Sequence, residues 1–193
     1  MRRRTEAGFT LIEVVVVVAV IAILAAVLTP YITKYIDDSR IAKARNEVQV
    51  IGGAMTNFYK DVGGWPNRNA AGTVQATALY YTGPRTPATA AIFTVTPPVV
   101  PPVVATWPGT VIPIDNSLLT NGTGSAYPTI GDMQWRGPYT GGALPADPWG
   151  NPYVVNYAAS GPIWVLSAGP NVKVQTAATD NVVRGDDIGF RVR

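Results

Sequence analysis

The stretch Gly8-Phe9-Thr10-Leu11-Ile12-Glu13 opens an apolar segment that continues without a break to Leu28, and this segment decides the fold. From Phe9 to Leu28 there are 20 residues, of which Glu13 is the only charged one. Twenty residues of α-helix rise about 30 Å, which is the thickness of the hydrocarbon core of a bilayer. Because a segment in lipid must satisfy its own backbone hydrogen bonds, the sequence predicts a membrane-spanning helix.

Two other interpretations of this segment are open on the residues alone. Arg2, Arg3 and Arg4 precede the apolar run and small residues such as Ala25 lie within it, as in a secretory signal peptide. The second interpretation is a plain signal anchor, which would only tether a domain to the membrane. Neither explains Glu13, since a carboxylate near a membrane edge costs about 1 to 3 kcal/mol, and such residues are usually functional and paired.

The segment closely resembles the class III signal of type IV pilins and of the pseudopilins of type II secretion systems. The resemblance implies that prepilin peptidase removes residues 1–8 by cutting between Gly8 and Phe9, and that Phe9 becomes an N-methylated amino terminus. Glu13, the fifth residue after the cut, matches the glutamate of that family. The match implies that Glu13 pairs with the α-amino group of Phe9 on a neighbouring subunit during assembly. Two buried opposite charges are tolerable only as such a pair.

The composition excludes several classes of function. The chain has 15 basic and 12 acidic residues and a formal charge of +3, but loss of residues 1–8 would remove three arginines and one glutamate and leave about +1. This near-neutral charge weakens a nucleic-acid interpretation, and we expect no nucleic-acid partner. The 193 residues include no Cys and no His, which excludes disulfides, thiol nucleophiles, Cys/His zinc sites and a Ser-His-Asp triad. We therefore expect a protein that is not an enzyme.

The helix is expected to continue beyond the membrane segment. Pro30 follows that segment, and inside a helix it removes one hydrogen bond and kinks the chain; the alternative is that the helix ends there. We favour continuation because apolar residues resume at helical spacing. This stripe consists of Ile41, Ala44, Val48, Ile51, Met55, Phe58 and Val62. The helix should end near Asp61, because Gly63-Gly64 and Trp65-Pro66 are stop signals.

Two glycines, Gly52 and Gly53, interrupt this stripe at a cost of about 1 kcal/mol each relative to alanine. We expect the close approach of a strand or of a neighbouring helix to explain them. After the helix, a short second helix is predicted around Val74–Tyr81. Residues 86–114 contain no charged residue and are rich in Pro, Thr and Val, which favours extended, polyproline-like backbone lying against the head or a neighbouring subunit, with a solvent-exposed linker as the alternative.

The carboxy-terminal part reads as a small sheet that covers the apolar stripe. Two strands separated by a turn at Ser160-Gly161 predict a hairpin, and two further strands follow it. The predicted strands are Tyr153–Tyr157, Ile163–Ser167, Val172–Gln175 and Ile188–Val192.

The loop between Ser167 and Ile188 gathers oxygen donors, which are Asn171, Asp180, Asn181, Asp186 and Asp187. Hard oxygen ligands on a loop suit Ca²⁺, although acidic loops of this kind are more often solvated turns. The stretches Leu144–Tyr153, Ser167–Asn171 and Gly185–Ile188 resemble the carboxy-terminal half of the major (G-type) pseudopilin of type II secretion.

That resemblance implies a structural calcium ion. The carbonyl of Ala168, the side chain of Asn171, and the carboxylates of Asp186 and Asp187 would be its ligands. Asn171 departs from the family, which usually has aspartate there, and the loop from Asn171 to Asp186 is long. The resemblance covers residues 8–66 and 135–190.

The expected fold is therefore α+β and type IV pilin-like, with a long amino-terminal helix packed against a small antiparallel sheet. Its expected parts are a leader (1–8), a transmembrane and filament-core helix (9–29), the second half of the helix (30–62), a connecting region (63–134) and a carboxy-terminal sheet with a calcium loop (135–193).

Three classes of function remain. The chain resembles most a major pseudopilin that polymerises from the inner membrane into a periplasmic filament. The second class is a type IV pilin for adhesion, motility or DNA uptake, and the third is a membrane-anchored enzyme or binding protein. The first class implies as partners further copies of the chain, prepilin peptidase, the inner-membrane assembly platform, minor pseudopilins and, before assembly, membrane lipid. The arginines of the leader predict a cytoplasmic amino terminus and a periplasmic head.

Overall fold

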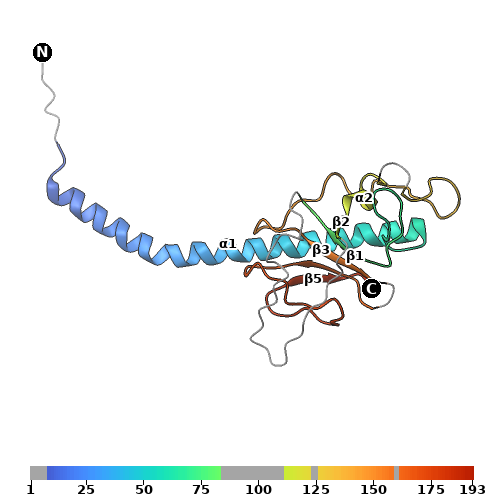
Figure 1. The fold of residues 1–193 in the computed structure, drawn as a ribbon. Helices are drawn as coiled ribbons and strands as arrows, with labels where there is room; N and C mark the ends of the chain where they lie inside the picture. The colour runs from blue at the N-terminus through green and yellow to red at the C-terminus, as the bar shows by residue number, and fades with distance from the viewer. Residues whose placement is uncertain (1–7, 84–110, 123–125, 159–160) are drawn as a thin grey trace, which may run out of the picture. The chain divides into compact units, whose positions relative to one another are not determined.

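The computed structural model describes residues 8–83, 111–122, 126–158 and 161–193 (Figure 1). Their elements follow the order α1, β1, β2, α2, β3, β4 and β5, with the bounds Leu11–Val62, Thr77–Tyr81, Val111–Pro113, Asp115–Leu118, Val154–Ala158, Trp164–Ser167 and Ile188–Arg191. A long helix thus precedes a five-stranded sheet, and the predicted α+β class is confirmed. The chain divides into two units, one ending at Ser39 and the other beginning at Arg40.

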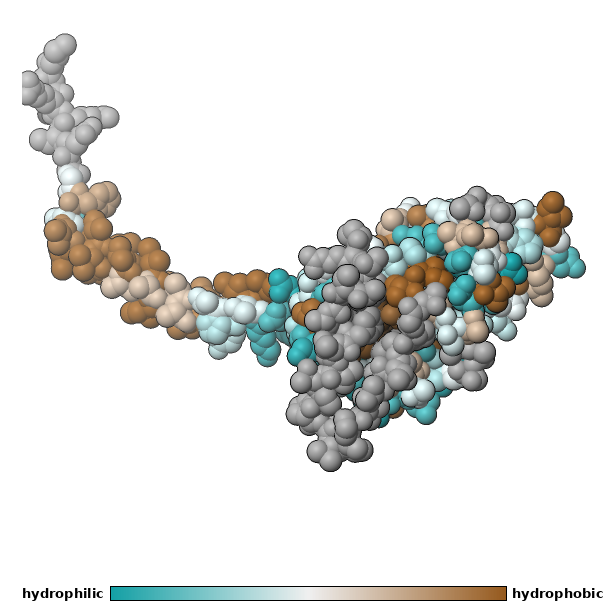
Figure 2. All heavy atoms as spheres, viewed as in Figure 1, coloured by the Kyte–Doolittle hydropathy of each residue, from teal (hydrophilic) through white to brown (hydrophobic). Residues whose placement is uncertain are grey.

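The first unit contains the amino-terminal part of α1. Every described residue from Gly8 to Ser39 is exposed, and the apolar side chains cover this part of the helix (Figure 2). Among the described residues, α1 is the one helix that is long and apolar enough to cross a membrane, and none of its apolar window is buried. The segment therefore has the length and the surface that a lipid environment requires.

Pro30 lies inside α1, which is continuous from Leu11 to Val62. The alternative in which the helix ends at this proline is therefore wrong. The hydroxyls of Thr29 and Thr33 donate to carbonyl oxygens one turn earlier, at 2.7 Å and 3.1 Å, and such bonds often bend a helix. The kink expected at Pro30 stays a prediction.

The second unit is built on the carboxy-terminal part of α1, of which one face is buried. The residues of this face are Ala44, Val48, Ile51, Gly52, Ala54, Met55 and Phe58. They include five of the seven residues of the predicted stripe, and the remaining two, Ile41 and Val62, pack at the margin of the same core. The predicted packing of the helix on the head is confirmed.

The sheet has the strand order β2-β1-β3-β4-β5. β3, β4 and β5 form antiparallel pairs in sequence, and β1 lies antiparallel to β3. β1 and β2 are parallel, however, with Leu79 opposite Val111 and Tyr81 opposite Pro113. The sheet is therefore mixed, and the expectation of an antiparallel sheet is wrong for its edge pair.

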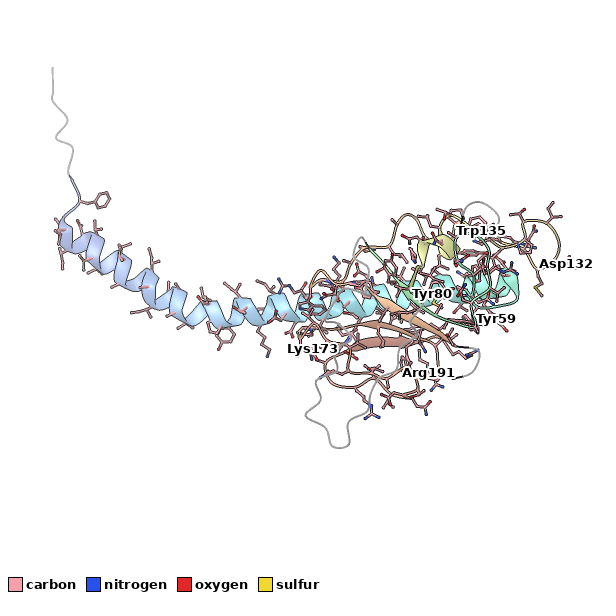
Figure 3. All side chains as sticks on the ribbon, viewed as in Figure 1. Tyr59, Tyr80, Asp132, Trp135, Lys173 and Arg191 are labelled. Carbon is pink, nitrogen blue, oxygen red and sulfur yellow. The ribbon has the colours of Figure 1, made fainter. Side chains whose placement is uncertain are left out.

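Both faces of the sheet are covered. Alternate residues such as Tyr80, Val155 and Val165 belong to the core shared with α1, and Figure 3 labels Tyr80 in the interior of the head. Leu79, Val154, Trp164 and Leu166 point to the other side, where they pack with Ala168, Val174 and Val183. The loop between β4 and β5 thus covers the second face of the sheet, as α1 covers the first.

The helix predicted around Val74–Tyr81 is wrong. Residues Thr77–Tyr81 form β1, in which Ala78, Leu79 and Tyr80 are all buried. The threonine and tyrosines favour extended backbone, and β1 gains a hydrogen-bonded neighbour on each side. Pairing with β2 and β3 therefore stabilises the extended backbone that these residues favour.

The strand predicted at Val172–Gln175 is also wrong. This segment lies in the loop between β4 and β5, and Val172 has a positive φ of 63°, which strand backbone does not adopt. The N–H groups of Gln175 and Thr176 donate to the carboxylate of Asp187 instead of to a neighbouring strand.

Three predictions fall partly outside the described residues. The extended stretch over 86–114 is described only from Val111, where it does form the extended strand β2. The leader 1–8 is described only at Gly8. The hairpin turn at Ser160-Gly161 is described only at Gly161.

Gly52 marks the closest approach of α1 to the sheet. A Cβ atom at this position would overlap the ring of Phe190 on β5, whereas a Cβ at Gly53 would meet nothing within 4 Å. The expectation that a strand approaches closely is confirmed for Gly52 alone.

Substituting Gly52 and Gly53 one at a time by alanine tests whether only Gly52 is needed for the close approach of Phe190. Gly52→Ala should destabilise the head by about 1–3 kcal/mol, because the ring of Phe190 must move. Gly53→Ala, the matched control, should stabilise it by about 0.4–1 kcal/mol through helix propensity. Urea unfolding of the full chain in detergent, followed by tryptophan fluorescence, measures both, since all five tryptophans lie after Gly64. Equal effects of the two substitutions would contradict the close approach.

Candidate functional site

Thr10 and Glu13 cap the start of α1 reciprocally. The backbone N–H and the hydroxyl of Thr10 each donate to Oε2 of Glu13 at 2.8 Å, and the N–H of Glu13 faces the Thr10 hydroxyl oxygen at 3.3 Å. This is a capping box, a threonine followed three residues later by a glutamate, which satisfies N–H groups that the first helical turn leaves unpaired. Sequence reasoning missed the role of Thr10, although Thr-x-x-Glu before an apolar run is a recognised signature.

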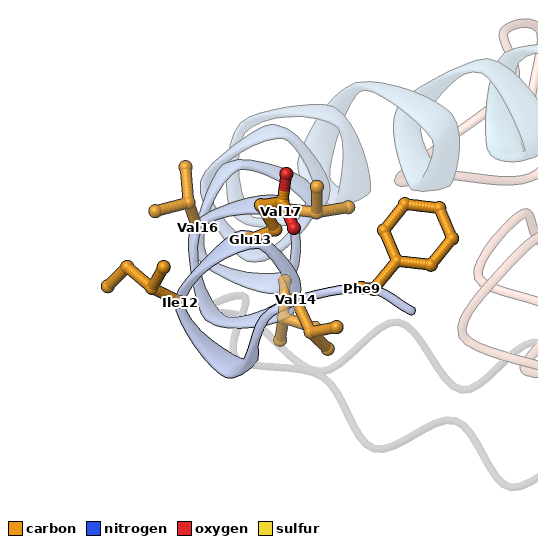
Figure 4. Close-up of a pocket in the computed structure, with 7 residues that line it drawn as sticks. Phe9, Ile12, Glu13, Val14, Val16 and Val17 are labelled. Atoms are coloured by element: carbon orange, nitrogen blue, oxygen red, sulfur yellow. The ribbon is translucent and has the colours of Figure 1, made fainter. Parts of the chain in front are cut away.

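The carboxylate of Glu13 stands in apolar surroundings. Phe9, which is 89% exposed, and side chains of the first two turns, among them Ile12, Val14 and Val17, line the surface around it (Figure 4). Within the described part of the chain, both donors of Thr10 reach Oε2, and no donor reaches Oε1. One oxygen is therefore held by the chain itself and the other is available to a donor from elsewhere.

Gly8 and Phe9 lie just before the helix begins, in exposed backbone without regular structure. A Cβ at Gly8 would meet nothing within 4 Å, so the peptide bond that joins these residues is open to a processing enzyme. Cleavage at this bond and methylation of Phe9 stay predictions.

The loop between β4 and β5 brings two of the predicted ligands, Asn171 and Asp186, into direct contact. The backbone N–H of Asn171 donates to Asp186 at 2.9 Å, and the side-chain amide of Asn171 donates to the second carboxylate oxygen. The N–H of Lys173 donates to the amide oxygen of Asn171 at 2.7 Å. The loop also approaches Asp186 so closely at Gly169, the residue after Ala168, that a Cβ there would overlap the Asp186 carbonyl.

Asp187 is the buried member of this group. Only 8% of it is exposed, and its Oδ2 accepts the N–H groups of Gln175 at 2.8 Å and Thr176 at 2.7 Å. Burial raises the pKa of Asp187 to about 6, although the bonds from Thr176 and Gln175 act to lower it. Its Oδ1 is also buried and, among the described residues, has no hydrogen-bond partner. A buried carboxylate oxygen without a partner is costly, so a cation beside it would be stabilising.

Asp180, the other aspartate of the loop, has a different role. Its carboxylate forms an ion pair with Arg184, with N···O distances of 2.6 Å and 2.9 Å, and accepts the N–H of Ala177. The Arg184 guanidinium lowers the pKa of Asp180. The Asp180 carbonyl also accepts the indole N–H of Trp164 on β4 at 2.8 Å. The long stretch between Asn171 and Asp186 is thus folded onto the sheet by its own contacts.

A further aspartate, Asp147, ties this loop to the preceding turn. Its Oδ1 accepts the N–H groups of Trp149 and Asn151, and its Oδ2 accepts the hydroxyl of Ser167 at 2.7 Å. The N–H of Gly169 in turn faces the Ser167 hydroxyl oxygen at 3.2 Å. Burial raises the pKa of Asp147. Sequence reasoning did not single out Asp147, although an aspartate before Pro-Trp-Gly-Asn is a typical Asx-turn signal.

The donor set fits a hard cation in part. Two carboxylates, an amide and nearby carbonyls are the ligands that Ca²⁺ takes from loops. The described residues contain no cluster of three or more His, Cys, Asp or Glu side chains suited to a metal. The unpartnered Oδ1 of Asp187 is the observation that favours a cation, while the bonds between Asn171 and Asp186 satisfy those side chains without one.

Two regions of the chain, one amino-terminal and one carboxy-terminal, are similar to known protein families. A profile of the prokaryotic N-terminal methylation motif matches residues 3–29. A profile of type II secretion system protein G matches residues 118–185, which run from the end of α2 through β3 and β4 into the loop after β4. No solved structure matches the chain significantly.

Two curated proteins are similar over part of their length. Fimbrial protein EcpC of Eikenella corrodens is 40% identical over 77 residues, which cover 40% of this chain and 50% of that protein. Type II secretion system core protein G of Pseudomonas aeruginosa is 30% identical over 67 residues, which cover 35% of this chain and 47% of that protein. The chain therefore spans about half of the length of these relatives.

The methylation motif includes the capped start of α1, and the protein G match includes β3, β4 and the loop after β4 as far as Gly185. A long amino-terminal helix on a small sheet is the architecture expected from both matches. The chain thus combines a prokaryotic N-terminal methylation motif with a region similar to protein G of the type II secretion system, and both matches support a relationship to type IV pilins and pseudopilins.

Proposed function

We propose that the chain is a structural subunit of a helical filament, the major pseudopilin of a type II secretion system. The observation that carries this proposal is a capped carboxylate, Glu13, at the start of an exposed apolar helix whose head carries a protein G domain. Exposed apolar surface of this extent must be covered, first by lipid and then by other subunits. The subunit would assemble from the inner membrane, with its head in the periplasm.

Processing would prepare the charge pair. Once prepilin peptidase cuts after Gly8, the α-amino group of Phe9 lies next to the capping residue Thr10. Oε1 of Glu13 would accept that amino group from a neighbouring subunit, while Thr10 keeps Oε2 in place. Two opposite charges that meet in an apolar filament core favour addition of the subunit that completes the pair. The assembly platform and minor pseudopilins would be further partners.

A surface pilus is the second candidate, because the fimbrial relative is 40% identical over its matched region. The two functions differ in what fails when the gene is deleted. Loss of a pseudopilin should retain folded exoproteins in the periplasm and leave surface fibres intact. Loss of a surface pilin should remove the fibres and leave secretion unchanged.

We also propose a structural calcium ion in the loop after β4. Asp187, through Oδ1, Asp186, Asn171 and the carbonyl of Ala168 would hold it. A bound cation would compensate the two adjacent carboxylates. The bonds from the N–H groups of Gln175 and Thr176 to Asp187, and from the N–H of Gly169 to the Ser167 hydroxyl oxygen, would keep the loop in place around it.

Glu13→Ala should leave cleavage and methylation intact but abolish filaments. Losing one partner of a buried pair costs about 3–5 kcal/mol, which lowers an association constant more than about a hundredfold. Gel mobility of the cleaved subunit and electron microscopy of sheared filaments measure the two steps. Thr10→Ala should give an intermediate loss, because removing an N-cap costs about 1 kcal/mol, and Thr10→Ser is the matched control. Normal filaments from Glu13→Ala would contradict the pairing.

Calcium should raise the melting temperature of the purified protein. Free Ca²⁺ at about 100 times its Kd adds about 2.7 kcal/mol, or about 5–10 °C for a domain of this size. Calorimetry in EGTA and then in excess Ca²⁺ measures the shift. Asp187→Asn should abolish it, whereas Asp132→Asn, which alters an exposed aspartate elsewhere, should preserve it. An unchanged melting temperature in the wild-type protein would rule out the calcium site.

The stability of the calcium-free head should depend on pH through Asp187. Burial raises its pKa in the folded protein to about 6, above the ordinary value of an aspartate, so the folded state binds the proton more tightly. The free energy of unfolding should therefore rise as the pH falls from 7.5 to 4, by up to about 3 kcal/mol from this group. Urea unfolding in EGTA should show this rise in the wild type and a smaller one in Asp187→Asn. Parallel pH profiles would contradict it.

A further inference from the structure

The apolar surface of α1 does not stop at Leu28. Four exposed apolar residues follow it: Tyr31, Ile32, Tyr35 and Ile36, which are 60%, 56%, 72% and 48% exposed. Tyr35 lies four residues after Tyr31, and Ile36 lies four residues after Ile32. Residues at this spacing lie on the same side of a helix, so the four form one face, here called the Tyr31–Ile36 face. Thr33 and Lys34 lie outside it.

The polar groups around this face are satisfied within the helix. The hydroxyls of Thr29 and Thr33 donate to backbone carbonyls of α1 rather than pointing to a neighbour. Between Glu13 and Asp37, Lys34 is the only charged residue. A long side chain such as that of lysine keeps its ammonium at the membrane surface while its stem lies along the apolar region. The segment up to Ile36 is therefore compatible with lipid, and Asp37 and Asp38 end that compatibility.

The face begins within the headgroup layer at Tyr31 and ends a few ångströms beyond it. The 20 residues from Phe9 to Leu28 rise about 30 Å, which fills the hydrocarbon core. Tyr31 and Tyr35 follow Leu28 by three and seven residues, or about 4.5 and 10 Å. The headgroup region on each side of the core is about 5–7 Å thick, and tyrosine is enriched there because its ring is apolar and its hydroxyl polar.

We propose that the Tyr31–Ile36 face binds the headgroup layer of the membrane and sets the direction in which α1 tilts. Spanning helices tilt by about 20° on average, and interfacial Tyr and Lys residues fix the tilt and rotation. With Tyr and Ile on one side and Lys34 on the other, the Tyr31–Ile36 face turns toward the bilayer and Lys34 toward water. This inference rests on the membrane-spanning helix alone and does not require a filament.

A second copy of the chain is the other possible occupant of the face. The structure favours lipid because the face continues the exposed apolar surface of the spanning segment without interruption. In addition, the neighbouring threonine hydroxyls bond to their own helix, whereas helix pairs in membranes commonly use such hydroxyls across the interface.

A depth scan tests the proposal with the full chain in lipid vesicles at low protein-to-lipid ratio. Because the chain has no native cysteine, single cysteines at 27–39 can each carry a spin label without background. Collision rates with oxygen and with a nickel chelate give the depth of each label. We expect depth to decrease along the helix with a superimposed oscillation of about 2 Å amplitude and 3.6-residue period, deepest on the Tyr31–Ile36 face.

Removing both rings with Tyr31→Ser and Tyr35→Ser should abolish that oscillation at the remaining positions. Val50→Ser, which removes an exposed apolar side chain of α1 outside the face, should leave it unchanged. A linear depth profile, an oscillation deepest at Lys34, or one that appears only at high protein-to-lipid ratio would overturn the proposal, the last in favour of a second copy. None of these outcomes affects the filament test at Glu13, which measures assembly.

Discussion

The structure of the head depends on a sheet that must be covered on both faces. α1 covers one face through the residues around Ile51 and Phe58. The other face, with Leu79 and Leu166, is covered by the loop between β4 and β5. A loop in this position needs a fixed conformation, because Val174 has to stay against the sheet. In a chain without cysteine, that conformation cannot come from a disulfide.

Aspartates provide the constraint instead. Asp147 and Asp187 each accept two backbone N–H groups of the surrounding turns, and Asp180 accepts one and pairs with Arg184, so each carboxylate holds backbone in place. Bonds to charged acceptors are stronger than those between neutral groups. Two of these carboxylates are buried and have raised pKa values, which shows that their burial costs free energy. Among the described residues, Oδ1 of Asp187 is the oxygen of these three carboxylates that has no partner, and a cation there would recover most of that cost.

Much of the fold follows from the sequence because its signals are periodic or local. The stripe of α1 has the helical period, and both its burial and its end near Asp61 were predictable. β1 was missed because its pairing with β2 and β3 is set by residues far along the chain. The false strand at Val172–Gln175 has strand-like residues, but its N–H groups bond to a carboxylate. At the functional end, Glu13 stood out as a lone charge, whereas Thr10 looked like an ordinary polar residue.

The contact of Gly52 with Phe190 has a mechanical consequence. The ring rests on the helix backbone itself, so α1 cannot slide or rotate past β5 without lifting it. A force that pulls on α1 along its axis is therefore carried into β5 as shear. β5 begins at Ile188, directly after Asp187, and pairs with β4. The hydrogen bonds of Asp187 thus lie at the end of the strand through which such a load would enter the sheet.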